Sequence, residues 1–410
     1  MAEMRTTLEP GAQRRLEAYF DRLGAVLGTD GRRASFATYA TGLLGNGERK
    51  SMEPIAALAC PNPATVDAAH QSLLHFVGKG CWSDARVRQE AAGYALSEVV
   101  RRAPIESWII DDTGFLKQGR HSVGVQRQYT GSAGKVTNCQ VGVSLSLASR
   151  TAHLPIDFEL YLPKSWTEDR DRRREVHIPE ALVFETKPQL ALKMIRRAVA
   201  DGMPKGVVNA DAAYGDSSAF RKGIRNLSLD YAVGVSSTTK VWLTDSLDRR
   251  RGAPLAVAEL ADRRMHSFRR ITWREGTKER LSARFVLERV VPYHDDGIAP
   301  SVREDVWLLM EWEDDKPKPN KFHFINLPPG KRSARNIVRI IKQRWRTERV
   351  YEDMKGEIGL DHFEGRSFPG WHHHISVALS CYAYVVAEQA RRFPPSARKA
   401  PRDSSNALAA

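Results

Sequence analysis

The spacing of apolar residues predicts a helical N-terminal region. Between residues 12 and 27, apolar side chains such as Leu16, Phe20 and Leu23 recur at helical spacing, and the breaker G-T-D-G follows at 28–31. Further helical segments are predicted at about 33–43, 51–60, 64–77 and 83–101. We therefore expect residues 1–100 to form a helical bundle. Its scattered Arg and Lys residues fit either DNA binding or a solvated charged face.

After Glu106 the pattern becomes extended. Trp108 to Ile110 is an apolar run that leads into Asp111 and Asp112, which predicts a buried strand with acids at its C-terminal end. Further strands are predicted at 121–129, 139–147, 154–162 and 206–209. Asp211 follows the last of them, so a second acid stands at the end of a strand.

The remaining chain alternates between strands and helices. T-K-P-Q at 186–189 is a capping box that begins a helix ending at about Ala200. Residues 226–334 show short alternating runs separated by Gly, Pro and Asp, which predicts a β-rich insertion. Helices are predicted at 341–355 and from His374 to about Arg391, with a loop at 359–366 between them. The overall prediction is an α/β fold with a sheet flanked by helices.

The predicted helix at 341–355 places a carboxylate between two cations. Arg344, Glu348 and Lys355 fall on one helical face, and Ile337 and Ile341 continue that stripe upstream. This arrangement suits a carboxylate that holds a metal ion while its neighbours hold phosphates. An ion-paired solvent face is the alternative, because such pairs are common and weak.

Composition points to a polyanionic partner. The 410 residues are 42% hydrophobic, enough to bury a core, and 63 Lys and Arg against 49 Asp and Glu give a net charge of +14. Nucleic acid is the partner that such a charge favours. The chain has no apolar run of membrane-spanning length and no apolar segment of a signal peptide at its start, so we expect no membrane association and a cytoplasmic location.

Cysteine and histidine do not predict a metal centre. The four cysteines, at 60, 81, 139 and 381, form no C-x-x-C pair and have no histidine at ligand spacing, which argues against zinc and against a disulfide framework. His372, His373 and His374 are consecutive, so on a helix they point in three directions.

The carboxylates are the stronger candidates for chemistry. Asp111 with Asp112, Asp211 and Glu348 lie on three separate predicted elements. Phosphodiester chemistry uses such acids to clamp two metal ions about 4 Å apart. Hard oxygen ligands select Mg²⁺, with Mn²⁺ as a substitute.

At this point the residues resemble a known family, the insertion-sequence DDE transposases with a ribonuclease H-like core. The type it resembles carries its third acid in a Y-x2-R-x3-E-x6-K helix, and Ile341, Arg344, Glu348 and Lys355 stand at that spacing, with Ile in place of Tyr. Similar segments are W-I-I-D-D-T-G-F-L-K-Q-G at 108–119, H-S-V-G-V-Q-R-Q-Y at 121–129, N-A-D-A-A-Y-G at 209–215 and L-D-H-F-E-G-R at 360–366. The resemblance spans about residues 10–390.

The resemblance implies three metal-binding acids. They would be Asp112 or Asp111, then Asp211, then Glu348. Neighbouring strand residues point to opposite sides, so one of Asp111 and Asp112 faces the metals. Asp112 stands directly before Thr113 and is slightly favoured, while Asp111 fits the D-x-T form of the motif.

The resemblance also implies DNA contacts. Arg344 and Lys355 would hold phosphates of the transposon end. Trp345 would either stack on an unpaired base or pack against the core. Lys117 and Arg120 would either contact DNA or form a solvated turn.

The implied function is DNA transposition. The chain would cut transposon ends by hydrolysis and join the 3′-hydroxyls to target DNA, acting as a homodimer on its terminal inverted repeats, in a bacterial nucleoid. The alternatives are a non-catalytic DNA-binding regulator and a stand-alone metal-dependent endonuclease. The implied domains are a DNA-binding domain at 1–100, catalytic core at 101–225 and 335–392, the insertion at 226–334, and a disordered tail at 393–410.

Overall fold

The fold comes from a computed structural model. It describes residues 10–244, 250–275, 280–293, 305–327 and 333–392. The predicted C-terminal tail lies outside the described residues. Among the helices it describes, none combines the length and the apolar character needed to cross a membrane.

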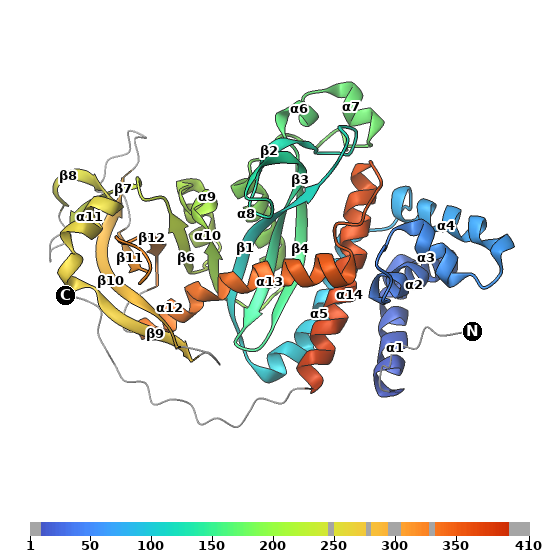
Figure 1. Ribbon diagram of the computed structural model, residues 1–410, viewed down its shortest axis with the longest axis horizontal. Helices are drawn as coiled ribbons and strands as arrows, with labels where there is room; N and C mark the ends of the chain where they lie inside the picture. Colours follow the sequence, from blue (N-terminus) through green and yellow to red (C-terminus); the bar gives the residue numbers. More distant parts are fainter. Residues whose placement is uncertain (1–9, 245–249, 276–279, 294–304, 328–332, 393–410) are drawn as a thin grey trace. The chain divides into compact units, whose positions relative to one another are not determined.

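The described chain divides into two compact units. The first contains residues 10–105, 111–201 and 346–392, and the second contains residues 106–110 and 202–345. Strand β1 (Ile105–Leu116) contributes residues to both (Figure 1). β1 is longer than the apolar run predicts, because it continues through Asp111 and Asp112 instead of ending there.

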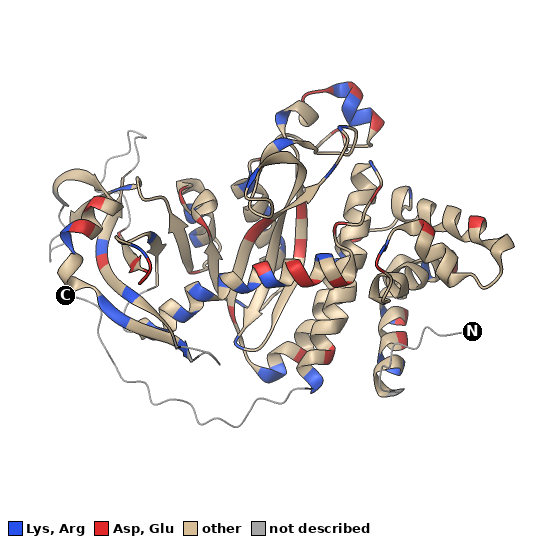
Figure 2. Ribbon diagram, viewed as in Figure 1, with Lys and Arg blue, Asp and Glu red and all other residues tan. Residues whose placement is uncertain are grey.

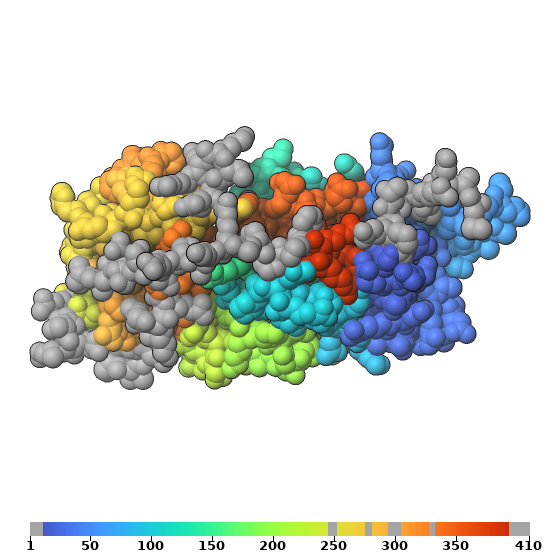
Figure 3. Space-filling view, turned by 90° about the horizontal axis from the view of Figure 1, so that it is seen from below, coloured from blue at the N-terminus to red at the C-terminus, as the bar shows by residue number. Residues whose placement is uncertain are grey.

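The first unit begins with the helices that the apolar spacing predicts. They are α1 (Pro10–Leu27), α2 (Asp30–Leu44), α3 (Met52–Ala59), η1 (Pro63–Thr65), α4 (Val66–Gly78) and α5 (Asp84–Arg102). Helix α14 (Phe368–Arg392) packs against α1, α2, α4 and α5. Its buried partners include Tyr19, whose hydroxyl donates to the Ser380 carbonyl at 2.9 Å. Figure 3 shows α1, α5 and α14 forming one continuous surface.

The sheet of the first unit is organised around a long strand, β3 (Lys135–Ser149). Antiparallel partners β2 (Gln126–Thr130) and β4 (His153–Tyr161) pair with successive parts of β3, and β1 lies on its other side. The strand predicted at 121–129 is therefore wrong over its first five residues. Helix α8 (Lys187–Ala200) begins with the predicted capping box of Thr186 and Gln189. Two short helices, α6 (Lys164–Thr167) and α7 (Arg170–Glu175), precede it.

A buried group of charges links these elements. Asp157 on β4 accepts from Arg197 of α8 at 2.6 Å and lies 3.1 Å from Arg88 of α5. Arg88 is 6% exposed and also bonds Asp84 at 2.6 Å. Burial raises the pKa of Asp157, and the two arginines oppose that shift. Each buried carboxylate in this group is therefore compensated by a guanidinium of the same group.

The second unit contains most of the remaining strands. Parallel strands β5 (Val207–Ala210) and β6 (Tyr231–Val235) follow residues 107–109 of β1 in the sheet. The order continues with antiparallel strands β12 (Lys321–Ile325), β11 (Val306–Trp312), β10 (Arg280–Pro292), β7 (Lys240–Thr244) and β8 (Arg250–Ala256), and β9 (Arg269–Glu275) pairs with β10. Its short helices are α9 (Ala212–Gly215), α10 (Ser218–Asn226), α11 (Val257–Arg263) and η2 (Met265–Ser267). The sequence pattern did not predict α11.

The predicted single helix at 341–355 is wrong. The chain forms α12 (Ala334–Lys342), a 3₁₀ turn η4 (Gln343–Trp345), α13 (Arg346–Asp353) and a π-helical turn η5 (Met354–Ile358). The side chain of Asn209 donates to the Ile340 carbonyl at 2.8 Å. In a continuous α-helix that carbonyl would accept from the amide of Arg344. The backbone amide of Gln343 donates to this Ile340 carbonyl, three residues earlier, which is the hydrogen-bond spacing of a 3₁₀ turn.

Candidate functional site

In the first unit, Asp111 and Asp112 lie within β1 and are both half-buried. Oδ2 of Asp112 is 3.1 Å from Nζ of Lys187, the first residue of α8. The amide of Asp112 donates to Oδ1 of Asp111 at 2.9 Å. Lys187 had no role in the sequence-based prediction, although the capping box correctly predicted the start of the helix that carries it.

The packing of Phe115 identifies the face of the sheet toward which Asp111 points. A Cβ on Gly142 would lie 3.0 Å from the Phe115 ring and 3.1 Å from the Phe158 ring, so these rings share one face. The Phe158 ring packs against Tyr351 of α13, with centroids 6.2 Å apart. Because strand residues alternate, Asp111 lies on the Phe115 face and Asp112 on the opposite one.

Helix α13 is fixed to that face by buried polar contacts. The hydroxyls of Tyr351 and Ser144 are hydrogen-bonded at 2.6 Å, and Thr347, which is fully buried, lies 3.4 Å from Nε2 of His153. Arg346 donates to the Ser149 carbonyl at 2.9 Å. These contacts leave Glu348 exposed, and its carboxylate makes no ion pair or hydrogen bond within the described residues. Figure 2 shows acidic and basic residues alternating along α13.

Lys355 joins the turn after α13 to strand β1. Its ammonium donates to the Gly114 carbonyl at 2.7 Å and lies 5.5 Å from the centroid of the Phe115 ring. Burial lowers the pKa of Lys355, and the carboxylate of Asp361 opposes this shift. Lys355 is therefore a structural link between η5 and β1 as well as a candidate phosphate ligand.

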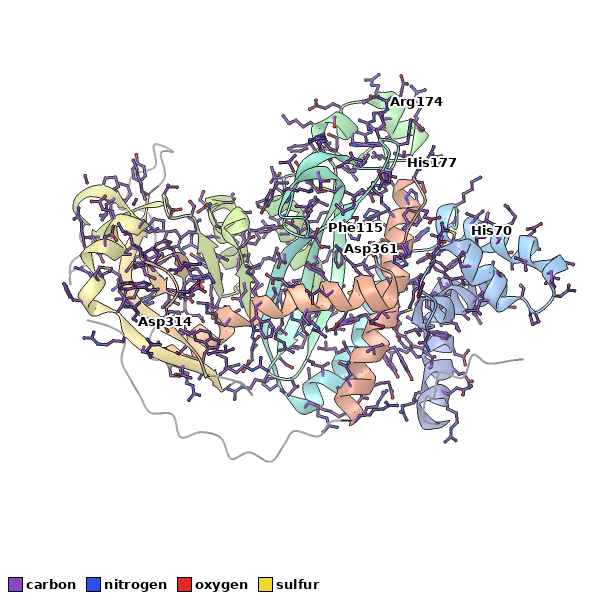
Figure 4. The ribbon with its side chains drawn as sticks, in the orientation of Figure 1. His70, Phe115, Arg174, His177, Asp314 and Asp361 are labelled. Carbon is purple, nitrogen blue, oxygen red and sulfur yellow. The ribbon has the colours of Figure 1, made fainter. Side chains whose placement is uncertain are left out.

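The side chain of Lys117 is bound within the protein, whereas the side chain of Arg120 is exposed. The ammonium of Lys117 donates to the Phe363 carbonyl, and burial lowers the pKa of Lys117 while Asp361 again opposes the shift. Arg120 is exposed, and its carbonyl accepts from Arg172 at 3.2 Å. Phe115 and Asp361 are labelled in Figure 4. Asp361 belongs to the L-D-H-F-E-G-R segment, where sequence alone assigned it no role.

In the second unit, Asp211 ends β5 and caps the next helix. Its Oδ1 accepts from the amide of Ala213 at 3.0 Å. The turn packs tightly on β6, since a Cβ on Gly215 would lie 1.9 Å from the Gly234 carbonyl oxygen. Glycine is therefore required at the end of the N-A-D-A-A-Y-G segment. The register of the second unit pairs Ile109 of β1 with Asn209 of β5.

Arg344 and Trp345 lie in η4 of the same unit. Trp345 is 49% exposed, so the alternative that it packs in the core is wrong. The guanidinium of Arg274 on β9 lies 5.8 Å from the Trp345 ring centroid. Arg344 is half-buried, and burial together with Lys342 and Arg344 lowers the pKa of His323 to about 3. Sequence alone did not assign roles to Arg274 and Asn209, because their contacts are made through distant elements.

The candidate acids offer the donors that hard cations prefer. In the first unit they are the half-buried Asp111 and Asp112, of which Asp112 pairs with Lys187, and the exposed Glu348. Carboxylate oxygens of this kind fit Mg²⁺ or Mn²⁺. Within either unit, the described residues contain no group of three or more His, Cys, Asp or Glu side chains placed to hold a metal ion.

The three consecutive histidines of α14 have separate buried partners. His373 stacks on Trp82 with centroids 3.9 Å apart, and its Nδ1 is 2.8 Å from the Val77 carbonyl. His374 is 2.8 Å from the Tyr39 hydroxyl, and His372 is 3.1 Å from the Phe368 carbonyl. His373 and His374 therefore hold N-terminal helices against α14, whereas the bond of His372 lies within α14.

The chain also resembles known proteins in sequence. Residues 22–280 match the family described as a DDE superfamily endonuclease, and residues 185–384 match a transposase DDE domain. A probable transposase for insertion sequence element IS701 from Microchaete diplosiphon is 30% identical over 168 residues, which is 41% of this chain and 41% of that relative. The chain thus aligns with less than half the length of that relative. Because the first family match covers more than half of the chain, this protein belongs to the DDE endonuclease superfamily, among the transposases of insertion sequences.

Proposed function

We propose that the chain is a DNA transposase that cuts the ends of an insertion sequence and joins them to target DNA. Water hydrolyses the phosphodiester at the end of the element and leaves a 3′-hydroxyl, which then attacks a target phosphodiester in line. Asp111 or Asp112, Asp211 and Glu348 would hold two Mg²⁺ ions, with Mn²⁺ as a substitute. When bound, these ions activate the attacking oxygen and stabilise the leaving oxygen.

One observation carries the proposal most directly. Within the first unit, the strand of the first acid and the helix of the third acid are bonded together through Lys355 and Gly114. α13 is also fixed to the sheet by Tyr351 and Thr347, so the exposed carboxylate of Glu348 is on a rigid support. Functional groups held on packed elements meet the positional demands of catalysis better than groups on loops.

Of the two neighbouring aspartates, we favour Asp111 as the metal ligand. The motif spacing favours Asp112, but that carboxylate is neutralised by Lys187. Asp111 lies on the face covered by α13, which carries Glu348. Asp112 and Lys187 then act as a positioning pair that holds β1 against the start of α8.

The fold of the catalytic core is proposed to be ribonuclease H-like. Support comes from the chain order, in which β1, β3 and β4 precede α8, and β5, which pairs with β1 in parallel, follows it. Strands β7 to β11 support a β-rich insertion at 226–334 within a core at 101–225 and 335–392. The domain at 1–100 would bind DNA.

The DNA contacts are proposed from charge and exposure. With a net charge of +14, the chain should bind duplex DNA with a strong salt dependence. Arg344 and the exposed Arg120 are candidates for phosphate contacts, while Lys355 and Lys117 would first have to leave their carbonyl partners. Trp345 is exposed enough to stack on an unpaired base. Cutting and joining two ends together requires at least a homodimer on DNA.

The test is cleavage and joining of labelled duplex DNA that carries the terminal inverted repeats of the element, with Mg²⁺ or Mn²⁺. The wild-type protein should cut and join, and Glu348→Gln should lower cleavage about 100-fold or more, as expected on losing a metal ligand. Glu352→Gln, one turn later on the same helix and also exposed, should remain active.

The alternatives predict different results. Sequence-specific binding without cleavage by the wild-type protein would indicate a DNA-binding regulator. Cleavage without joining would indicate an endonuclease. Full activity in Glu348→Gln together with loss in Glu352→Gln would assign the third acid to Glu352.

A further inference from the structure

The surface formed by η1 and the first two turns of α4 is exposed and makes few contacts. Residues 61–65 are all exposed, and none of residues 66–72 is buried. The buried residues of α4 lie in its second half, at Leu73, Phe76 and Val77. The start of α4 therefore projects from the helical bundle while its end is held in place.

The end of α4 is anchored by aromatic stacking and a hydrogen bond. The rings of Phe76 and Trp82 stack with centroids 5.0 Å apart, and Nδ1 of His373 lies 2.8 Å from the Val77 carbonyl. Gly80 completes this anchor, because a Cβ there would lie 2.5 Å from the Phe76 carbonyl oxygen. A projecting helix on such a rigid base can enter a groove without unfolding.

One face of α4 carries a regular stripe of small and neutral polar side chains. Ala68, Gln71, Ser72 and His75 follow one another at i, i+3, i+4 and i+7, and all four are exposed. Between residues 61 and 74 the only charged side chain is Asp67, although 27% of the whole chain is charged. A face that served only solubility would carry Lys, Arg and Glu. This face instead carries groups that make specific hydrogen bonds.

The side chains of the stripe are available for a partner. Gln71 and His75 make no hydrogen bond within the described part of the chain, and Ser72 bonds only the Ala68 carbonyl of its own helix. Asn62 caps η1 through Oδ1, which accepts from Ala64, and its amide nitrogen remains unused among the described residues. His70 marks the position of this surface in Figure 4.

Two cationic groups lie beside the C-terminal half of the stripe. Lys79 follows directly after α4 and is exposed. A recess of about 380 Å³ lies between the start of α2 and the stripe, and Arg32 lines it together with Ser35, Gln71 and His75. Cationic groups beside a stripe of neutral polar groups match how proteins divide phosphate contacts and base readout on duplex DNA.

We propose that η1 and the first two turns of α4 enter the major groove of duplex DNA, where Gln71 is a specificity-determining residue. The major groove admits an α-helix, and Gln reads adenine through its N6 and N7 atoms. Recognition helices present their N-terminal residues to base edges, and the preceding helix, α3 here, lies across the backbone. This inference rests on the proposed function in one respect only, which is that the partner is DNA.

The test selects preferred sequences with the full-length protein and a library of duplexes with a randomised centre. The wild type should enrich one motif. Gln71→Ala should lose preference at one or two positions of that motif and bind the wild-type consensus about 5- to 150-fold more weakly. Its affinity for a scrambled duplex and its melting temperature should stay unchanged, which excludes a folding defect.

A matched control is Gln13→Ala, an exposed glutamine on α1 whose amide bonds Glu17. It should enrich the wild-type motif with wild-type affinity. The inference is overturned if the wild type enriches no motif, or if Gln71→Ala combined with Asn62→Ala leaves motif and affinity unchanged. Enrichment that depends on Gln71 in a protein that never cuts DNA would support this inference and overturn the transposase proposal.

Discussion

The Nζ atom of Lys355 lies 2.7 Å from the carbonyl oxygen of Gly114, three residues beyond Asp111 on the same strand. This bond is charge-assisted and half-buried. Lys355→Met should therefore lower the stability of the first unit by about 1–3 kcal/mol in urea unfolding. It should also lower cleavage, because the third-acid helix loses its link to β1. Lys135→Met, at an exposed position of β3, should change neither. Wild-type activity in Lys355→Met would show that this link does not position the site.

The two neighbouring aspartates should respond unequally to neutralisation. Asp111→Asn should lower single-turnover cleavage about 100-fold or more, because its carboxylate lies on the α13 face. Asp112→Asn should have a smaller effect on cleavage and a measurable effect on stability, because it breaks the pair with Lys187. The opposite ranking would make Asp112 the metal ligand, as the motif spacing favours.

Trp345 should contribute to DNA binding and not to folding. As the side chain is 49% exposed, Trp345→Ala should change stability by no more than about 0.5 kcal/mol. Loss of one stacked base should weaken binding to a duplex with an unpaired terminal nucleotide by about 1–3 kcal/mol. Trp345→Phe keeps an aromatic face and should recover most of this affinity. If the wild type, Trp345→Ala and Trp345→Phe bound this duplex with equal affinity in a fluorescence titration, a stacking role would be refuted.

Removing Arg88 should destabilise the protein strongly. Arg88→Met removes the guanidinium shared by Asp157 and Asp84; Arg197 still pairs with Asp157, so we expect a loss of up to about 3–5 kcal/mol, the cost of breaking a buried ion pair. Thermal unfolding should show a large fall in melting temperature. Arg22→Met removes a more exposed pair with Glu90 and should change the melting temperature little. If Arg88→Met and Arg22→Met lowered the melting temperature by similar amounts, the buried charges would not stabilise one another strongly.

Stability should fall in acid partly because of His153. Burial lowers the pKa of His153 to about 3 from 6.5, so below about pH 6.5 the unfolded chain binds a proton that the folded chain excludes. Its contribution to stability is complete above about pH 6.5 and is lost as the pH falls toward 3. His153→Phe should reduce the stability lost between about pH 7 and pH 4.5 by about 2 kcal/mol. His266→Phe, at an exposed position, should keep the wild-type pH dependence.

Sequence predicts elements well where local spacing decides their structure. The Thr186 capping box and the apolar spacing of α1 depend on nearby residues, and both correctly predict helices. The candidate acids were also visible, because short strand-like runs precede Asp111 and Asp211, although β1 continues beyond Asp111. These features carry most of the family resemblance.

Other features depend on residues far away in the chain. The break at η4 coincides with a bond from Asn209 to Ile340, 131 residues away, and no local signal at 341–345 reveals it. The different surroundings of Asp111 and Asp112 likewise depend on Lys187 and Phe115. Such tertiary contacts override the helical spacing and the strand-end pattern from which the predictions were made.

The packing of α14 has a consequence for the synthesis of the protein. Tyr39 and His374 are hydrogen-bonded across 335 residues, and α14 covers apolar surface on α1, α2, α4 and α5. On the ribosome these N-terminal helices emerge first and must wait for α14 before their shared core can close. The first unit is thus assembled late in translation. A nascent chain that stops before α14 would expose this apolar surface to chaperones and proteases.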